Sequence, residues 1–457
     1  MLTVGVVSLG CSKNRVDTEL MLHILQANGY ALTLDEREAD ILIVNTSGYI
    51  EPAKQESIDT LLELSQYKKT GRLKLLVATG CLTQRYEKAL WEGMPEVDLL
   101  LGVEAYERLP ALLKRALAGE RVSDCGVHGG VLAGERVLTT APYTAYVRIA
   151  DGCDNRCAYC AIPLIRGGYR SRELDDVLRE IASLAAGGVR EHVLVAQDTS
   201  RFGVDKAGRS LLPELMTRAA DIPGVDWLRV LYCYPDTVDE RLLEAMASRD
   251  NICRYLDLPL QHADPELLRR MNRRGDIDAT RALLLRARAM GFTLRTTMIT
   301  GFPGETEAQF QTLLDFVADI RFDRLGAFAF SAEDDTPAAD MPDQVPPALR
   351  QERLDRLMAL QQGIALERNR VRVGAVEKVL LQSVSDDGRA EGRTAAEAPE
   401  TDGLVRLTGA RGAEPGMLSA IGAPTSFVSF LCSSIVVPLS KFFFIINAYP
   451  PFADSQG

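Results

Sequence analysis

The stretch Asp151-Gly-Cys153-Asp-Asn-Arg-Cys157-Ala-Tyr-Cys160 carries three cysteines with the spacing CxxxCxxC. It follows directly on residues 145–150, an apolar run typical of a buried strand. Three thiolates on one short loop can hold three irons of a 4Fe-4S cluster and leave the fourth iron open to another ligand. A structural zinc site is the alternative, but it needs four protein ligands, and His128 and His192 are both distant in the sequence. We therefore predict an iron-sulfur cluster on this loop.

The composition is that of an acidic, globular protein with more than one domain. At 457 residues the chain is too long for one hydrophobic core, and 46% hydrophobic with 25% charged residues is ordinary for packed domains. The formal net charge of -11 gives no general attraction to phosphate backbones, so a nucleic acid would need a local basic patch. Five of the nine cysteines lie in or beside loops suited to metal, which indicates a reducing compartment, the cytoplasm. The other four are expected to be small buried side chains: Cys125, Cys233, Cys253 and Cys432.

Residues 1–125 are expected to form a parallel α/β domain. Three apolar runs, separated by helical patterns, have the character of strands that are buried on both faces: residues 3–8, 40–45 and 73–79.

The loops after these three runs contain Cys11, Ser47 and Cys81. The carboxyl ends of parallel strands meet at one edge of a sheet, where such folds place their ligands. The three residues are therefore predicted to share a site, although each is far from the next in the sequence. The alternative is that Cys11 and Cys81 are buried thiols with no ligand to hold.

Residues 139–370 are expected to form a partial barrel. The segment contains six strand candidates: residues 145–150, 192–196, 227–232, 255–260, 294–300 and 325–330. Helical patterns lie between them, for example at residues 175–186 and 279–290. Six β/α units are too few for a closed eight-stranded barrel, so we predict a (β/α)6 barrel that is open on one side.

Polar residues follow several of these strands. They form three groups: Gln197-Asp198, Gln261-His262 and Gly301-Phe-Pro-Gly304-Glu-Thr306. A barrel carries its site at the carboxyl ends of its strands, which is also where the cysteine loop lies. Thr306 and Gln309 fit a capping box, so the N-terminus of a helix is expected to point toward a bound cofactor.

The C-terminal part of the chain changes character twice. After an amphipathic helix at about residues 348–371, residues 371–420 alternate β-type runs with Gly and Asp turns, which suggests a small β-barrel. The tail, residues 421–457, contains a strongly apolar run at 427–446. A membrane anchor is one interpretation of that run, but Pro438 and Lys441 interrupt it, and we favour an irregular tail.

Taken together, these motifs resemble those of the methylthiotransferases over residues 1–416. The match rests on Gly-Cys11-Ser-Lys-Asn-Arg-Val-Asp17, the Cys81 loop, the three-cysteine loop, Val195-Ala-Gln-Asp198, Asp257-Leu-Pro-Leu-Gln-His262 and Thr300-Gly-Phe-Pro-Gly-Glu-Thr306. In that family the N-terminal domain holds a second 4Fe-4S cluster through three cysteines. The central domain is a radical S-adenosylmethionine (SAM) barrel, and a small β-barrel called TRAM recognises the substrate.

The resemblance implies two 4Fe-4S clusters and bound SAM. One cluster would be held by Cys153, Cys157 and Cys160, and an auxiliary one by Cys11 and Cys81 with Ser47 at the third position. The residues that would contact SAM are Tyr159, Gln197, Asp198, Gln261, Gly301 and Gly304.

Two departures from the family change these expectations. The family has cysteine where this chain has Ser47. A serine oxygen is a harder donor than a thiolate, so the auxiliary cluster is expected to be weaker or only partly occupied. The sequence after about Met417 also differs from the end of a TRAM barrel, so this barrel is expected to be incomplete.

The implied reaction replaces an unactivated C–H bond with C–S–CH3, which acid-base chemistry cannot do. By resemblance, the first cluster passes an electron to SAM, a 5'-deoxyadenosyl radical removes the hydrogen, the auxiliary cluster supplies sulfur, and a second SAM supplies methyl. The run Tyr255-Leu-Asp-Leu-Pro-Leu-Gln-His262 resembles the ribosomal-protein (RimO-like) branch, which modifies the β-carbon of an aspartate on a small-subunit ribosomal protein. The resemblance further implies an electron donor such as flavodoxin or ferredoxin. It also implies that the protein is a monomer and is not bound to a membrane.

Two other functions stay open from the sequence. The first is the same chemistry on an adenosine of transfer RNA. Two features count against it: the chain is acidic, and residues 367–416 carry eight Lys and Arg against nine Asp and Glu, so they form no basic patch. The second is a catalytically impaired iron-sulfur protein, damaged at Ser47 and in the tail.

Overall fold

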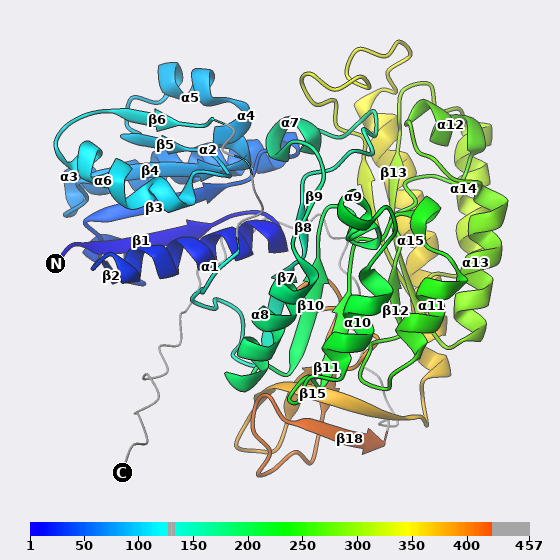
Figure 1. Ribbon diagram of the computed structural model, residues 1–457. Coiled ribbons are helices and arrows are strands. Elements are labelled where there is room, and N and C mark those ends of the chain that lie inside the picture. The colour runs from blue at the N-terminus through cyan, green and yellow to red at the C-terminus, as the bar shows by residue number, and fades with distance from the viewer. Residues whose placement is uncertain (127–128, 130–132, 423–457) are drawn as a thin grey trace. The chain divides into compact units, whose positions relative to one another are not determined.

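The computed structural model describes residues 1–126, 129 and 133–422 (Figure 1). Its contacts divide the chain between Thr139 and Thr140 into two compact units. Within the described part, no helix is both long and apolar enough to cross a bilayer. The apolar run at 427–446 and Cys432 lie outside the described residues.

The first unit is built on a six-stranded sheet in which all neighbouring strands are parallel. Across the sheet the strands are β2 (Ala31–Leu32), β1 (Thr3–Ser8), β3 (Ile41–Thr46), β4 (Leu75–Gly80), β5 (Leu99–Leu101) and β6 (Val122–Asp124). The helices are α1 (Ser12–Ala27), α2 (Glu51–Ser65), α3 (Tyr67–Thr70), α4 (Cys81–Arg85), α5 (Glu87–Gly93) and α6 (Leu109–Leu117). The three strands predicted from the sequence are confirmed at β1, β3 and β4.

The centre of this sheet is buried on both faces, as the continuous apolar runs predict. Every residue of β3 and β4 is buried. Alternate residues of β3 point to opposite sides, so Ile41 and Ile43 join one apolar cluster while Leu42 and Val44 join another. Cys125, 8% exposed, belongs to the second cluster, as expected of a small buried side chain.

The second unit contains the six predicted parallel strands, arranged as two three-stranded sheets. One sheet has the order β11 (Trp227–Val230), β10 (Glu191–Val195), β7 (Thr144–Arg148), and the other has the order β12 (Tyr255–Asp257), β13 (Thr293–Thr300), β14 (Arg324–Ala329). We expected one continuous partial barrel. Instead the ladder between β11 and β12 is reduced to an isolated bridge, Leu228 to Ile252, and a few backbone bonds such as Cys233 N–H to Asp257 O, 3.0 Å.

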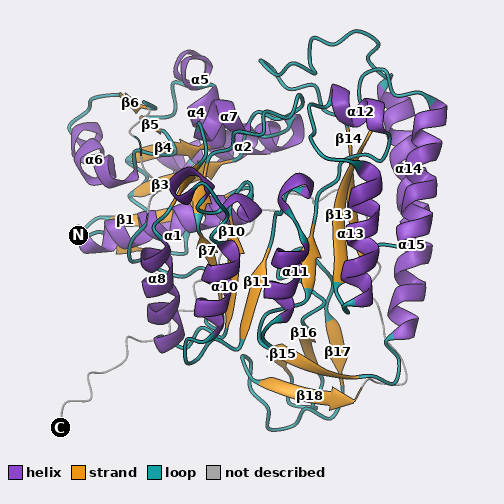
Figure 2. Cartoon of the chain, turned by 45° about the vertical axis from the view of Figure 1, so that its right-hand side comes forward, coloured by secondary structure: helices purple, strands orange, loops and turns teal. Residues whose placement is uncertain are grey.

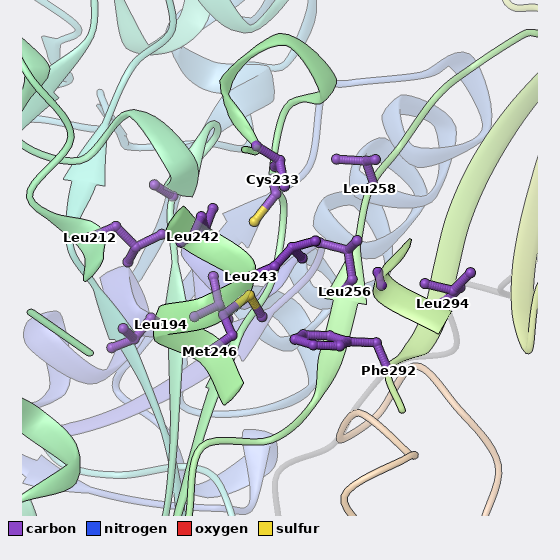
Figure 3. Packing of buried hydrophobic residues seen from close by; sticks show 14 of the residues in the cluster. Leu194, Leu212, Cys233, Leu242, Leu243, Met246, Leu256, Leu258, Phe292 and Leu294 are labelled. Carbon is purple, nitrogen blue, oxygen red and sulfur yellow. The ribbon is translucent and has the colours of Figure 1, made fainter. Parts of the chain in front are cut away.

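Helices cover the outer face of these strands (Figure 2). They are α8 (Leu174–Ala186), α10 (Leu212–Ala220), α11 (Glu240–Ala247), α13 (Ile277–Ala289), α14 (Glu307–Ile320) and α15 (Pro347–Val371), with the short helices α7 (Ile162–Arg166), α9 (Val204–Ala207) and α12 (Pro265–Arg270) in the loops. Figure 3 shows the packing between them, where Leu194 and Leu256 of the strands meet Leu243 of α11, and Cys233 lies in the same apolar cluster. Alternate strand residues face the other way, into the half-barrel.

The last described segment forms a four-stranded antiparallel sheet. Its order is β17 (Val405–Leu407), β16 (Ala390–Arg393), β15 (Val376–Val384), β18 (Leu418–Gly422). The sequence led us to expect the departure from a complete barrel after Met417. Within the described residues, β18 still pairs with β15, from Leu380↔Leu418 to Val376↔Gly422.

This C-terminal sheet is joined to the half-barrel by buried ion pairs. Arg393, which ends β16, donates through Nη1 to Glu191 at the start of β10, 3.1 Å, and Arg229 of β11 donates to the same carboxylate, 3.0 Å. Tyr255 of β12 donates to Asp402, 2.5 Å. The loop between β16 and β17 thus closes the amino-terminal end of the half-barrel and leaves the carboxyl end to the cysteine loop.

Candidate functional site

The three-cysteine loop connects β8 (Ala150–Asp151) to α7, and its shape depends on a glycine. Gly152 has a φ of +72°, and a Cβ there would lie 2.0 Å from the carbonyl oxygen of Gly168. The loop is closed by backbone bonds from Cys153 N–H to Gly167 O, 3.1 Å, and from Cys160 N–H to Cys157 O, 3.0 Å. β8 also pairs with β9 (Arg170–Ser171). The loop is therefore a defined turn that departs from a short hairpin.

A second segment, just after α12, holds the far side of the loop. Ala158 N–H donates to Met271 O, 2.9 Å, and the Asn272 side chain donates to Arg156 O, 2.8 Å. Arg156 has a φ of +49°, a conformation that costs energy for a residue with a side chain and that these contacts sustain. Sequence reasoning did not assign the segment after α12 to the site.

The three thiols of the loop differ in their exposure. Cys157 is 8% exposed, while Cys153 and Cys160 are partly exposed, and burial raises the pKa of Cys153 to about 11. Among the described residues, no three His, Cys, Asp or Glu side chains converge on one point as ligands of one metal ion. A 4Fe-4S cluster instead places each thiolate on its own iron, and metal binding would release the thiol protons.

Tyr159 lies beside the loop in an apolar cluster. It is 8% exposed and shares that cluster with Cys157, with Ile299 of β13 and with Phe302 of the loop that follows β13. Its hydroxyl accepts a hydrogen bond from Arg273, 3.3 Å. The structure therefore brings Tyr159 together with the Gly301–Thr306 segment, as the barrel argument predicted.

Gln197 and Asp198 follow β10 and differ in their surroundings. Asp198 is 1% exposed and accepts hydrogen bonds from Asn155 of the cysteine loop, 2.8 Å, and from Ser200, 2.7 Å. Burial raises its pKa, against the effect of those two bonds. Both polar atoms of the Gln197 side chain are buried with no hydrogen-bond partner in the described structure. Such a side chain is the kind that a bound polar ligand would satisfy.

Gln261 lies in the loop that follows β12. Its φ is +74°, and its backbone bridges β13 by Gln261 N–H to Thr297 O, 2.8 Å, and Ile299 N–H to Gln261 O, 2.7 Å. The next residue, His262, is fully buried, and burial lowers its pKa to about 4. Its Nε2 lies 3.7 Å from Glu305.

The loop after β13 folds around Glu305, a residue whose part the sequence did not reveal. Its carboxylate accepts from Gly301 N–H, 2.8 Å, and from Arg353 of α15, 2.9 Å. Burial nevertheless raises the pKa of Glu305 to about 7. The predicted capping box of Thr306 and Gln309 at the start of α14 is confirmed.

Gly301 and Gly304 are explained by packing. Both have a positive φ, +72° and +74°. A Cβ at Gly301 would lie 2.3 Å from Arg350, and one at Gly304 would lie 2.1 Å from Arg270. The space beside each glycine is thus filled by an arginine side chain.

In the first unit, the loops after β1, β3 and β4 lie against one another. A Cβ at Gly10 would be 3.2 Å from the Cβ and Oγ of Ser47, and a Cβ at Gly48 would be 3.0 Å from the carbonyl carbon of Cys81. Cys11 precedes α1 and is exposed, whereas Ser47 and Cys81 are 8% and 7% exposed. The structure therefore brings the segments of all three predicted residues together.

Asn14 of α1 makes hydrogen bonds to residues of these loops, a role that the sequence did not reveal. Its side-chain amide donates to Leu9 O and to Thr46 O, both at 3.1 Å, and its Oδ1 accepts from the Cys81 thiol at 3.5 Å. One side chain thus reaches the loops of three strands. Its local signals were its place one turn after Cys11 and its position within the motif Gly-Cys11-Ser-Lys-Asn-Arg-Val-Asp17.

Three family models match the chain: the uncharacterized protein family UPF0004 over residues 3–102, the radical SAM superfamily over residues 147–317, and the TRAM domain over residues 373–422. Two curated relatives each cover 90% of this chain. The ribosomal protein uS12 methylthiotransferase RimO of Desulforamulus reducens is 46% identical over 94% of its length, and that of Desulforudis audaxviator is 48% identical over 92% of its length.

A solved structure shows the same fold at low sequence identity. The radical SAM methyltransferase TsrM from Kitasatospora setae, with tryptophan substrate and a SAM analog bound, superposes with a TM-score of 0.52. It is 16% identical and covers 72% of this chain and 73% of its own. This likeness is one of fold alone.

Proposed function

The chain belongs to the RimO family of radical SAM methylthiotransferases, and on that premise we propose that it adds a methylthio group to the β-carbon of an aspartate of ribosomal protein uS12. The observation that carries the proposal is the three-cysteine loop at the carboxyl end of the half-barrel, in a chain that matches uS12 methylthiotransferases over 90% of its length. The run Leu258-Pro-Leu-Gln-His262 adds support from the family resemblance.

The first cluster is proposed on Cys153, Cys157 and Cys160, with SAM at its open iron. When bound, the cluster and SAM supply the radical that removes a hydrogen from an unactivated carbon. The chain's own residues position SAM and exclude water. The unpartnered amide of Gln197 offers an NH2 group that can donate and a carbonyl oxygen that can accept, and Tyr159 offers an aromatic surface in an apolar cluster.

The other residues proposed to contact or position SAM do so through their backbone or by positioning the cysteine loop. Gln261, Gly301 and Gly304 lie in backbone with positive φ at the mouth of the half-barrel. Asp198 positions the cysteine loop through Asn155.

An auxiliary 4Fe-4S cluster is proposed on Cys11 and Cys81, with Ser47 at the third position. Support comes from the contacts that gather these loops and from the bonds of Asn14. Because serine is the harder donor, occupancy of this cluster is expected to be low. An electron donor of the flavodoxin or ferredoxin class and a monomeric state complete the proposal.

Ser47→Cys should raise the iron content of the reconstituted protein toward about eight atoms per chain, the content of two 4Fe-4S clusters. It should raise methylthiolated product severalfold while leaving SAM cleavage unchanged, since the first cluster keeps its own ligands. Iron analysis, 5'-deoxyadenosine and product mass measure the three quantities.

The matched control is Ser65→Cys, which adds a thiol at another buried serine, 5% exposed, at the end of α2. Iron and product should stay at the wild-type level there. If Ser47→Cys changes neither quantity, then either position 47 does not ligate the auxiliary cluster, or serine already ligates it adequately.

The structure gives little support to transfer RNA as the substrate. Several basic residues of the C-terminal sheet, and Arg372 at the end of α15 before it, are engaged by acidic partners. Arg372 pairs with Glu377 and Glu397, Arg393 with Glu191, and Arg406 with Glu391. Cations that are paired in this way do not form the basic patch that RNA binding needs.

Ribosomes test the proposal in cells. In a strain lacking this protein, uS12 should be lighter by about 46 Da, the mass of the added CH2S. Re-expression of the wild-type chain should restore that mass. An unchanged uS12 mass in the deletion strain would refute the proposed substrate.

A further inference from the structure

We propose that Arg273 is a positioning residue that raises the reduction potential of the cluster on the cysteine loop. Arg273 lies three residues after α12 and is 8% exposed. The inference rests on the proposed function, because it needs a cluster held by Cys157.

Arg273 is fixed against the cysteine sulfur from several sides. Its Nη1 donates to Cys157 Sγ at 3.7 Å and to the Tyr159 hydroxyl at 3.3 Å, and its Nη2 donates to Pro259 O. The guanidinium carbon lies 4.2 Å from the centroid of the Tyr234 ring, and the Tyr234 hydroxyl is itself 3.7 Å from Cys157 Sγ. The cation is thus held over one ligand sulfur by an aromatic face and a carbonyl.

No carboxylate of the described residues forms an ion pair with Arg273, and its Nε is buried without a hydrogen-bond partner. The next residue, Arg274, differs in this respect, since it pairs with Asp236 at 3.5 Å. A buried cation without a counter-charge is costly in free energy. A cluster held by three thiolates carries negative charge and would supply the missing anion beside Arg273.

A fixed cation beside a ligand sulfur favours the reduced state. When the cluster accepts one electron from an external one-electron donor, no bond breaks and its charge becomes more negative by one. Arg273 stabilises that added charge more than the charge of the oxidised state, and hydrogen bonds to the sulfurs act in the same direction. The guanidinium therefore makes reduction easier.

The experiment is a redox titration of reconstituted full-length protein, monitored by electron paramagnetic resonance without SAM. All variants carry Cys81→Ala, so that only the first cluster contributes. Arg273→Gln should shift the midpoint potential to a more negative value by about 59 mV, a tenfold change in the one-electron equilibrium. Arg273→Lys, which keeps the charge, should fall between Arg273→Gln and the parent.

Arg274→Gln is the matched control, because it removes a neighbouring cation that contacts Asn155 but no cysteine sulfur. Its potential should equal that of the parent. An unchanged potential in Arg273→Gln would overturn the inference. So would the failure of both Arg273 variants to hold iron in a chain that circular dichroism shows to be folded, because Arg273 would then be a purely structural residue. If the parent itself holds no cluster, it is the proposed function that fails.

Discussion

Cys157→Ala should reduce the reductive cleavage of SAM by more than about 100-fold. Loss of an outer-shell partner of a metal site costs up to about that much, and loss of a direct ligand such as Cys157 should cost more. Cys157 is the most buried of the three loop cysteines, and it contacts Arg273 and Tyr234. Its removal takes away one of three proposed thiolates and leaves a buried cation beside an alanine. Iron content and 5'-deoxyadenosine formed per chain measure the loss.

Cys125→Ala is the matched control for this prediction. Cys125 is 8% exposed, as Cys157 is, but it packs in an apolar cluster of the first unit. SAM cleavage should persist in that variant. Cleavage undiminished in Cys157→Ala would remove the cysteine loop from the mechanism.

Glu191→Gln should lower the free energy of unfolding by about 3–5 kcal/mol, the cost of breaking a buried ion pair by removing one partner. The carboxylate of Glu191 is fully buried and lies between Arg229 of β11 and Arg393 of β16. Its neutralisation leaves two buried guanidinium groups without a counter-charge. Guanidinium chloride unfolding, followed by circular dichroism, measures the change.

The same carboxylate predicts a loss of stability in acid. Burial alone would raise the pKa of Glu191, but Arg393 and Arg229 outweigh that effect and hold it at about 2, below the ordinary 4.5. A group with a lowered pKa stabilises the folded state above its ordinary pKa and loses that contribution as the pH falls toward the folded-state pKa. Glu191→Gln should therefore remove part of the decline in stability between about pH 4.5 and pH 2.

Glu391→Gln is the control for both measurements. Glu391 pairs with Arg406 at a partly exposed position, where such a pair is worth about 1 kcal/mol or less. Equal effects of Glu191→Gln and Glu391→Gln would contradict the structural account of the buried network.

The parts of the fold that could be predicted from the sequence are those with a local signal. β1, β3 and β4 were found because each contains a short run rich in apolar residues. The six strands of the half-barrel were found because their apolar and β-branched residues alternate with helical patterns, although polar residues interrupt some of them, as in the run TLRTTMIT of β13. β2 and β5, of two and three residues, are too short to show a period. The division of the half-barrel into two sheets could not be predicted, because it depends on a ladder that fails between β11 and β12.

The candidate site divides in the same way. The cysteine spacing lies within ten residues, so the loop was visible in the sequence. Arg273 was not, because it lies 116 residues from Cys157 in the chain and its own sequence context, Asn-Arg-Arg-Gly, is that of a solvated turn. The contact of Arg393 with Glu191, 202 residues apart, was equally invisible.

The most direct test of the central claim is the mass of products from one reaction. Purified, reconstituted protein is incubated with SAM, a reductant, ribosomal protein uS12 and transfer RNA. We predict an increase of about 46 Da on an aspartate-bearing peptide of uS12, with transfer RNA unmodified. Methylthioadenosine in the transfer RNA with unmodified uS12 would contradict the account.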